Sequence, residues 1–141
     1  MPEYQGSCHC GAIGFRYACD APPASWAIRA CQCRFCRAHD ALSASDPAAT
    51  IRFTAGEPEE LQRYRFGLKT ADFLLCRRCG VYIGALIETP GGQFGIINTH
   101  ALTDAPPDLA APAPMHYDSE GVAGRVARRE ERWAPVREIP K

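Results

Sequence analysis

Cysteine spacing is the feature that most constrains how this chain can fold. Seven of the eight cysteines fall into three short motifs: C-x-C-G at 8–11, C-x-C-x-x-C at 31–36 and C-x-x-C-G at 76–80. In an extended strand, residues i and i+2 face the same side, so C-x-C can aim two sulfurs at one point. A tight turn does the same for C-x-x-C. Each motif can therefore bring two or three thiols together locally.

The two outer motifs have the pattern of metal half-sites. Gly11 and Gly80 directly follow the last cysteine of each motif. A glycine there lets the backbone turn through positive φ, so that amide N–H groups can point at the sulfurs. Two such half-sites make one tetrahedral four-cysteine zinc site. We predict this structural site, with Cys8, Cys10, Cys76 and Cys79 as its ligands.

The middle motif supplies three ligands where a structural zinc needs four. Cys31, Cys33 and Cys36 are close enough in sequence to hold one ion by themselves. A structural zinc has a closed fourth position, whereas a catalytic zinc keeps that position open for water or substrate. We therefore predict a second, open zinc site at these three cysteines, which gives two zinc ions per chain.

Two other side chains offer ways to close this site. His39 lies three residues after Cys36, and C-x-x-H can complete a structural site of three cysteines and one histidine. Cys19 is the other candidate, although its position between an apolar run and a turn is more typical of an ordinary buried thiol. The open and the closed site both remain interpretations of the sequence.

Arginines flank the cysteine motifs. Three thiolates around a zinc dication leave a net charge of about −1, and four leave about −2. Single arginines such as Arg29 or Arg77 are ordinarily solvated, but together they can balance such anions. Because a guanidinium binds carboxylates through two parallel bonds, we predict that Arg34 and Arg37 contact a substrate. His39 is the predicted proton relay at the same site.

Short apolar or alternating segments predict a mostly-β domain of short strands. The predicted strands are 12–17, 25–30, 50–54, 61–64, 70–75, 81–88 and 93–98. The turn signal TPGG at 89–92 predicts a hairpin between the last two strands. If the strand at 81–86 lay at a sheet edge, it would favour self-association into a homo-oligomer.

Other segments have weaker patterns. Residues 34–41 predict one or two helical turns, and the Pro/Ala-rich segment 103–114 predicts irregular surface structure. Residues 121–132 mix Arg and Glu densely, which fits a short helix with i,i+4 ion pairs or a solvated arm. We expect the solvated arm.

Length and charge exclude several classes of protein. A chain of 141 residues fits one domain, residues 1–141. Sixteen basic and sixteen acidic residues give no net charge, which argues against nucleic-acid or membrane-surface partners. The N-terminus lacks the pattern of a signal peptide, and no apolar run is long enough for a membrane span. We expect a cytoplasmic protein, whose cysteines serve metal or redox chemistry.

The motifs together resemble the glutathione-dependent formaldehyde-activating enzyme family, the Gfa/CENP-V domain. The stretches that carry the resemblance are GSCHCGA at 6–12, Phe15, CQCRFCR at 31–37, GEP at 56–58, Tyr64 and FLLCRRCG at 73–80. The tail at 115–141 matches poorly. The resemblance implies a β-tent zinc-binding fold, with a structural zinc on the four outer cysteines and a catalytic-type zinc on the middle three.

The resemblance also implies an activity. The family joins formaldehyde to glutathione, and the enzyme is a carbon–sulfur lyase in the reverse sense. We therefore predict a zinc-dependent protein that forms or binds a thiol–aldehyde adduct such as S-(hydroxymethyl)glutathione at Cys31, Cys33 and Cys36. The alternative is a non-catalytic module with two structural zincs, acting as a carrier or protein-interaction domain. A redox sensor built on the clustered thiols is a third interpretation.

Overall fold

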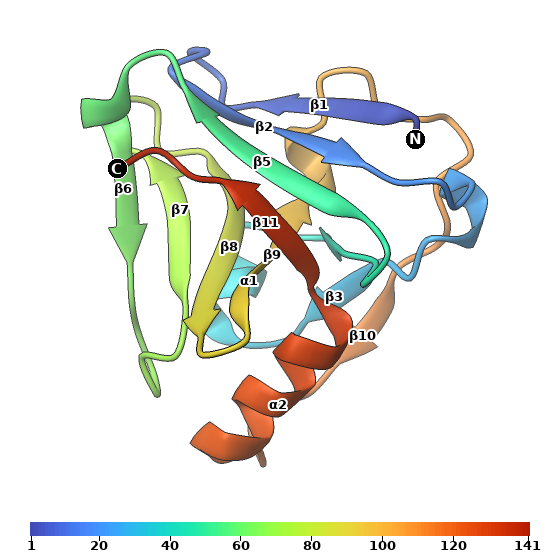
Figure 1. Ribbon diagram of the computed structural model, residues 1–141, viewed down its shortest axis with the longest axis vertical. Coiled ribbons are helices and arrows are strands. Elements are labelled where there is room, and N and C mark those ends of the chain that lie inside the picture. The colour runs from blue at the N-terminus through green and yellow to red at the C-terminus, as the bar shows by residue number, and fades with distance from the viewer.

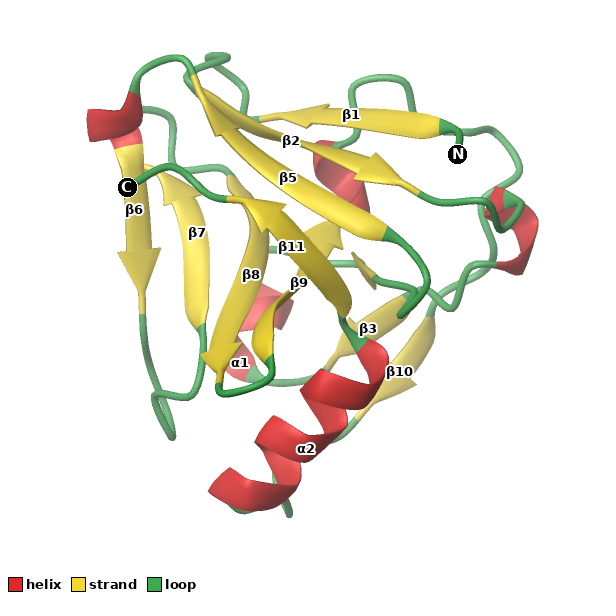
Figure 2. Ribbon diagram, viewed as in Figure 1, coloured by secondary structure: helices red, strands yellow, loops and turns green.

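Short β-strands dominate the computed structural model, which describes residues 1–141 (Figure 1). The strands are β1 (Glu3–Ser7), β2 (Ile13–Ala18), β3 (Arg29–Cys31), β4 (Ser43–Ala44), β5 (Thr50–Ala55), β6 (Leu61–Tyr64), β7 (Asp72–Cys76), β8 (Tyr82–Thr89), β9 (Gly92–Asn98), β10 (Ala113–Met115) and β11 (Ala134–Glu138). Figure 2 shows how little helix accompanies them. The fold is mostly β, as predicted, and has the β-tent character that the family resemblance implied.

Helices are few and short. They are α1 (Arg34–Ala38), α2 (Val122–Arg132) and three 3₁₀ turns, η1 (Pro23–Ser25), η2 (Pro58–Glu60) and η3 (Thr99–Ala101). None of them has the length and apolar character that crossing a bilayer requires. In Figure 1, α2 projects below the strands and leads directly into β11.

The strands form two hydrogen-bonded layers that share β11. In the first layer, β1, β2 and β5 pair antiparallel in that order, and β11 adds parallel to β5. In the second, β6, β7, β8 and β9 pair antiparallel, and β9 also pairs with β4 and with β11. Ala134 of β11 pairs with Gly95, whereas Val136 pairs with Ile51, so one strand joins both layers.

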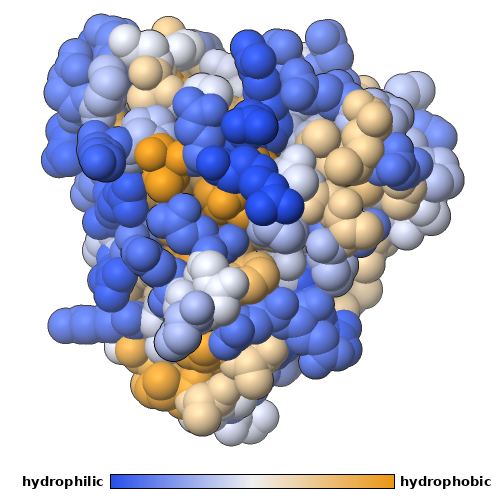
Figure 3. Space-filling view, in the orientation of Figure 1, coloured by the Kyte–Doolittle hydropathy of each residue, from blue (hydrophilic) through white to orange (hydrophobic).

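Two clusters of buried side chains fill the interior. The larger contains Phe15, Ile51, Phe53 and Ile83 from both layers, together with the cysteines Cys8, Cys19 and Cys76. The smaller one surrounds Cys36, Tyr82 and Trp133. Apolar side chains reach the surface only in separate patches on the face drawn in Figure 3. The outer cysteine motifs and the middle motif therefore belong to different parts of the core.

Most predicted strands are confirmed within one or two residues, and 61–64 coincides with β6. The hairpin is also confirmed, because Thr89 pairs with Gly92 at the β8–β9 turn. The prediction for 25–30 was only partly right, since η1 ends at Ser25 and the strand begins at Arg29. The strand at 81–86 is not at an edge, because β8 pairs with both β7 and β9.

The solvated arm expected at 121–132 is wrong. This segment is helix α2, and Arg129 within it is buried. The guanidinium of Arg129 reaches Thr70 Oγ1 at 2.6 Å and lies over the ring of Trp133, 4.9 Å from its centroid. The contact with Thr70 joins residues 59 apart in sequence, so local charge patterning gave no sign of it. The strands β1, β4, β10 and β11 were also not predicted.

Close packing between β8 and β9 yields a prediction about Gly84. A Cβ there would overlap the carbonyl oxygen of Ile96 and approach Phe53 Cε1 to 3.0 Å. Because a backbone oxygen cannot move aside, Gly84→Ala should lower the free energy of unfolding by about 2 kcal/mol or more. Gly124→Ala is the control: it lies in α2 with open space around it and should be neutral or stabilising, by up to about 1 kcal/mol. Urea denaturation of both variants tests this, and equal effects would contradict it.

Candidate metal centres and the adjoining cavity

The four cysteines of the outer motifs come together in space. Their sulfur atoms all lie within 4.8 Å of one another. The Sγ of Cys10 lies 3.7 Å from that of Cys8 and 3.6 Å from that of Cys76. Ligands at about 2.3 Å from a tetrahedral zinc lie roughly 3.8 Å apart, so the observed distances fit one shared ion. This cluster can bind a metal without rearrangement.

Turns at the strand ends position these four thiols. Gly11 and Gly80 have φ of 85° and 80°, the left-handed values that the sequence predicted for them. The backbone N–H of Ile13 donates to Cys8 Sγ at 3.4 Å, and that of Cys79 donates to Cys76 Sγ at 3.4 Å. These amides stabilise negative charge on the sulfurs, as expected for thiolate ligands.

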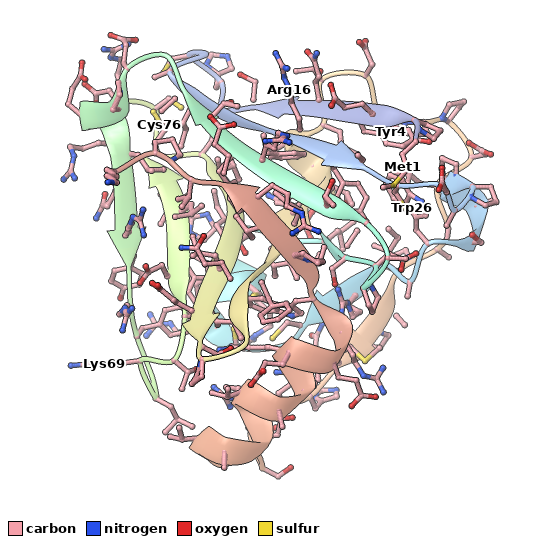
Figure 4. The ribbon with its side chains drawn as sticks, in the orientation of Figure 1. Met1, Tyr4, Arg16, Trp26, Lys69 and Cys76 are labelled. Carbon is pink, nitrogen blue, oxygen red and sulfur yellow. The ribbon has the colours of Figure 1, made fainter.

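The four-cysteine cluster links the two layers of strands. Cys8 follows β1, whereas Cys76 is the last residue of β7, at the upper end of that strand in Figure 4. Both are almost fully buried. Burial raises the pKa of the Cys76 thiol to about 12, so the thiolate form needs a cation close by. This burial and connectivity suit a structural site.

The three cysteines of the middle motif form a second group. Their sulfurs also lie within 4.8 Å of one another. Cys31 ends β3, and Cys33 caps α1 by accepting a hydrogen bond from the Cys36 amide at 3.4 Å. Thiol hydrogen bonds with Cys31 and Cys36 lower the pKa of Cys33, while thiol hydrogen bonds with Cys31 and Cys33 raise the pKa of Cys36. Only a bound cation would allow all three to ionise together, which fits a metal cluster.

Neither proposed fourth ligand joins this group. The ring of His39 packs on Phe35, with 4.5 Å between the centroids, and His39 is not part of the three-sulfur group. Cys19 is buried in the larger core, where its Sγ lies 3.9 Å from Asp46 Oδ2. The protein therefore offers three sulfurs here, without a fourth side chain from these two residues. The role of His39 as a proton relay stays a prediction.

A cavity of about 420 Å³ opens beside the three-cysteine group, whose residues form part of its wall. Its aromatic lining consists of Phe66, Phe73, Tyr117 and Trp133, and its cationic lining of Arg29, Arg125, Arg128 and Arg129. The volume lies within the range of about 300 to 1,000 Å³ that is typical of small-molecule sites. The cavity can hold a small ligand that contacts both the sulfurs and the guanidinium groups.

The arginines of this cavity differ from those predicted. Arg34 and Arg37 lie on α1, are exposed, and are not part of the cavity wall. Three of the four cavity arginines come from α2 instead, a segment expected to be solvated. One signal was present in the sequence: Arg125, Arg128 and Arg129 recur at the i, i+3, i+4 spacing that places side chains on one helix face.

Comparison with known proteins shows the family of this chain. A model of the glutathione-dependent formaldehyde-activating enzyme family matches residues 3–119, and the chain belongs to this family. Among solved structures, a Rhodobacter sphaeroides protein from a structural genomics programme is similar, at 29% identity and a TM-score of 0.59. That similarity covers 79% of this chain and 99% of the other. Helix α2 lies beyond the residues that the family model matches.

The difference between the clusters yields a prediction about metal content. We expect two divalent ions per chain, and Cys76→Ser should lose one of them and about 3 kcal/mol or more of stability, since this ion ties the layers together. Cys33→Ser should also lose one ion but less stability, because its cluster closes only a local loop. Elemental analysis and thermal denaturation provide the measurements. Cys19→Ala, a buried thiol outside both groups, should keep both ions.

A second prediction concerns His39. Because its ring packs on Phe35 outside the sulfur group, His39→Ala should keep the full metal content of the protein. The variant is measured by elemental analysis after dialysis against a weak chelator, beside Cys33→Ser as the variant that loses an ion. Loss of one ion in His39→Ala would mean that the histidine closes the site.

Proposed function

We propose that this protein joins a thiol to an aldehyde at the three-cysteine site, with S-(hydroxymethyl)glutathione as the expected type of product. The observation that carries the proposal is the position of Cys31, Cys33 and Cys36 in the wall of a ligand-sized cavity. Membership in a family named for glutathione and formaldehyde supports these two compounds as partners.

Two zinc ions per chain are part of the proposal. The four-cysteine cluster would hold the structural one, and the three-cysteine group would hold the other. Zinc at the second site would lower the pKa of a thiol that joins it. A three-cysteine ligand set suits zinc, because thiolates are among its usual ligands and a catalytic site keeps one position for substrate.

The reaction itself needs little beyond positioning. A carbon–sulfur bond forms between the thiol sulfur and the aldehyde carbon, the carbonyl π bond breaks, and the thiol proton ends on the former carbonyl oxygen. Holding both reactants in one cavity supplies much of the advantage that such an addition requires. Phe66, Phe73 and Trp133 give part of the cavity wall an apolar surface. His116 lines the same cavity, and an imidazole is well suited to moving a proton near neutral pH.

The test measures adduct formation directly. Exchange NMR of glutathione and formaldehyde should show faster formation of S-(hydroxymethyl)glutathione with the wild-type protein than without it. Cys33→Ser should reduce the added rate by more than about tenfold, since it removes a proposed metal ligand. Cys19→Ala serves as the matched cysteine control and should retain the rate.

A spectroscopic experiment tests whether thiols bind at the three-cysteine group without measuring turnover. In the cobalt(II)-substituted protein, a thiol that binds at the three-cysteine group should change the visible absorption bands. No acceleration and no spectral change with millimolar glutathione would contradict the proposal. The two clusters would then both be structural, as in a non-catalytic zinc module.

A further inference from the structure

Two buried arginines in the cavity wall lack an acidic partner. Arg29 and Arg129 are 8% and 7% exposed, and the Nε atom of each is buried without a hydrogen-bond partner. Arg29 Nη2 donates to the hydroxyl of Ser45, and Arg129 Nη1 donates to Thr70 Oγ1 at 2.6 Å. Hydroxyl groups satisfy a donor, but they do not neutralise a guanidinium charge.

The nearby carboxylate is already engaged by other arginines. Glu120 accepts hydrogen bonds from Arg128 Nε at 2.9 Å and Nη2 at 3.0 Å, and it lies 3.7 Å from Arg125 Nε. Neither Arg29 nor Arg129 forms an ion pair with it. Burial lowers the pKa of Arg129 to about 10, which reflects the cost of keeping this cation out of water.

Charge bookkeeping over the cavity leaves room for one anion. Its four arginines contribute four positive charges, and Asp118 in the wall and Glu120, which pairs with Arg128, contribute two negative ones. Three cysteine thiolates with one divalent ion add about −1. About one positive charge remains, and a buried unpaired charge is costly. A single carboxylate would balance it, whereas a phosphate would bring more negative charge than the count leaves open.

We propose that Arg29 and Arg129 form a carboxylate-binding subsite of this cavity. This inference rests on the proposed function, and it specifies the thiol: an acidic thiol that presents its sulfur to the three cysteines and its carboxylate to the two guanidinium groups. A guanidinium binds a carboxylate through two parallel hydrogen bonds, a geometry that a lysine cannot reproduce.

The subsite depends on the C-terminal part of the chain. Arg129 belongs to α2, beyond the residues matched by the family model, and Arg29 belongs to β3, two residues before Cys31. The ring of Trp133 supports the Arg129 guanidinium from one side. We therefore assign selectivity among thiols to Arg29 and Arg129, which lie where α2 meets the three-cysteine motif.

The experiment compares ligands of one size by calorimetric titration of the metal-loaded protein. The probes are 3-mercaptopropionate, its neutral amide 3-mercaptopropionamide, and butyrate, in which a methyl group replaces the thiol. The acid should bind about tenfold or more tightly than the amide, because charged hydrogen bonds to guanidinium are lost in the amide. Butyrate should compete with the acid.

Variants of Arg129 test whether this residue causes the preference for the acid over the amide. Arg129→Gln should remove the preference for the acid and leave the affinity of the amide unchanged, and Arg129→Lys should restore only part of the preference. Arg132→Gln is the control, since Arg132 is exposed on the same helix. Equal loss of preference in Arg132→Gln would overturn the assignment. The comparison of acid with amide on the wild-type protein decides the question even where a variant does not fold.

The remaining outcomes separate this inference from the proposed function. Equal affinity of the acid and the amide would overturn the subsite, while the cobalt(II) spectrum would still report whether thiols reach the metal. Competition by butyrate with no thiol effect on that spectrum would support the subsite and contradict the proposed function. Binding of inorganic phosphate in preference to butyrate would overturn the carboxylate assignment.

Discussion

The four-cysteine cluster is the constraint on which the rest of the structure depends. It joins the turn after β1, in one layer of strands, to the end of β7, in the other, and both Cys8 and Cys76 are buried in the larger core. Bringing segments so distant in sequence together costs chain entropy. A metal bound by four thiols can offset that cost, because binding free energy then becomes folding free energy. With the layers fixed in this way, the three-cysteine group need not hold the fold together.

Strand β11 is a second link between the two layers. β11 pairs with β5 in one layer and with β9 in the other, and α2 leads directly into it. Because β11 is held on both sides, α2 is anchored at its C-terminal end beside the cavity. Trp133, at the junction, packs in the smaller core with Cys36. The same connection that closes the fold therefore brings three arginines to the three-cysteine group.

The two cysteine groups differ in surroundings more than in sequence pattern. One is set into the larger core and offers four sulfurs at mutual distances that suit a tetrahedral ion. The other offers three and borders a cavity whose wall also carries guanidinium groups. The sulfurs and the guanidinium groups line one partly enclosed space, where electrostatic interactions are less screened than in bulk water. That arrangement is the basis of our proposal that a small acidic thiol binds here.

Local spacing was sufficient to predict the grouping of the seven cysteines, the glycine turns beside Cys10 and Cys79, and the β8–β9 hairpin, because each depends on backbone geometry over a few residues. It was not sufficient for α2 or for the cavity arginines. Whether Arg129 is solvated or buried is decided by Thr70 and Trp133, and the contact with Thr70 lies 59 residues away in sequence. The sequence by itself thus determined which sulfurs can share an ion. The tertiary structure decided which cations face them, since a side chain's burial depends on whatever distant segment packs against it.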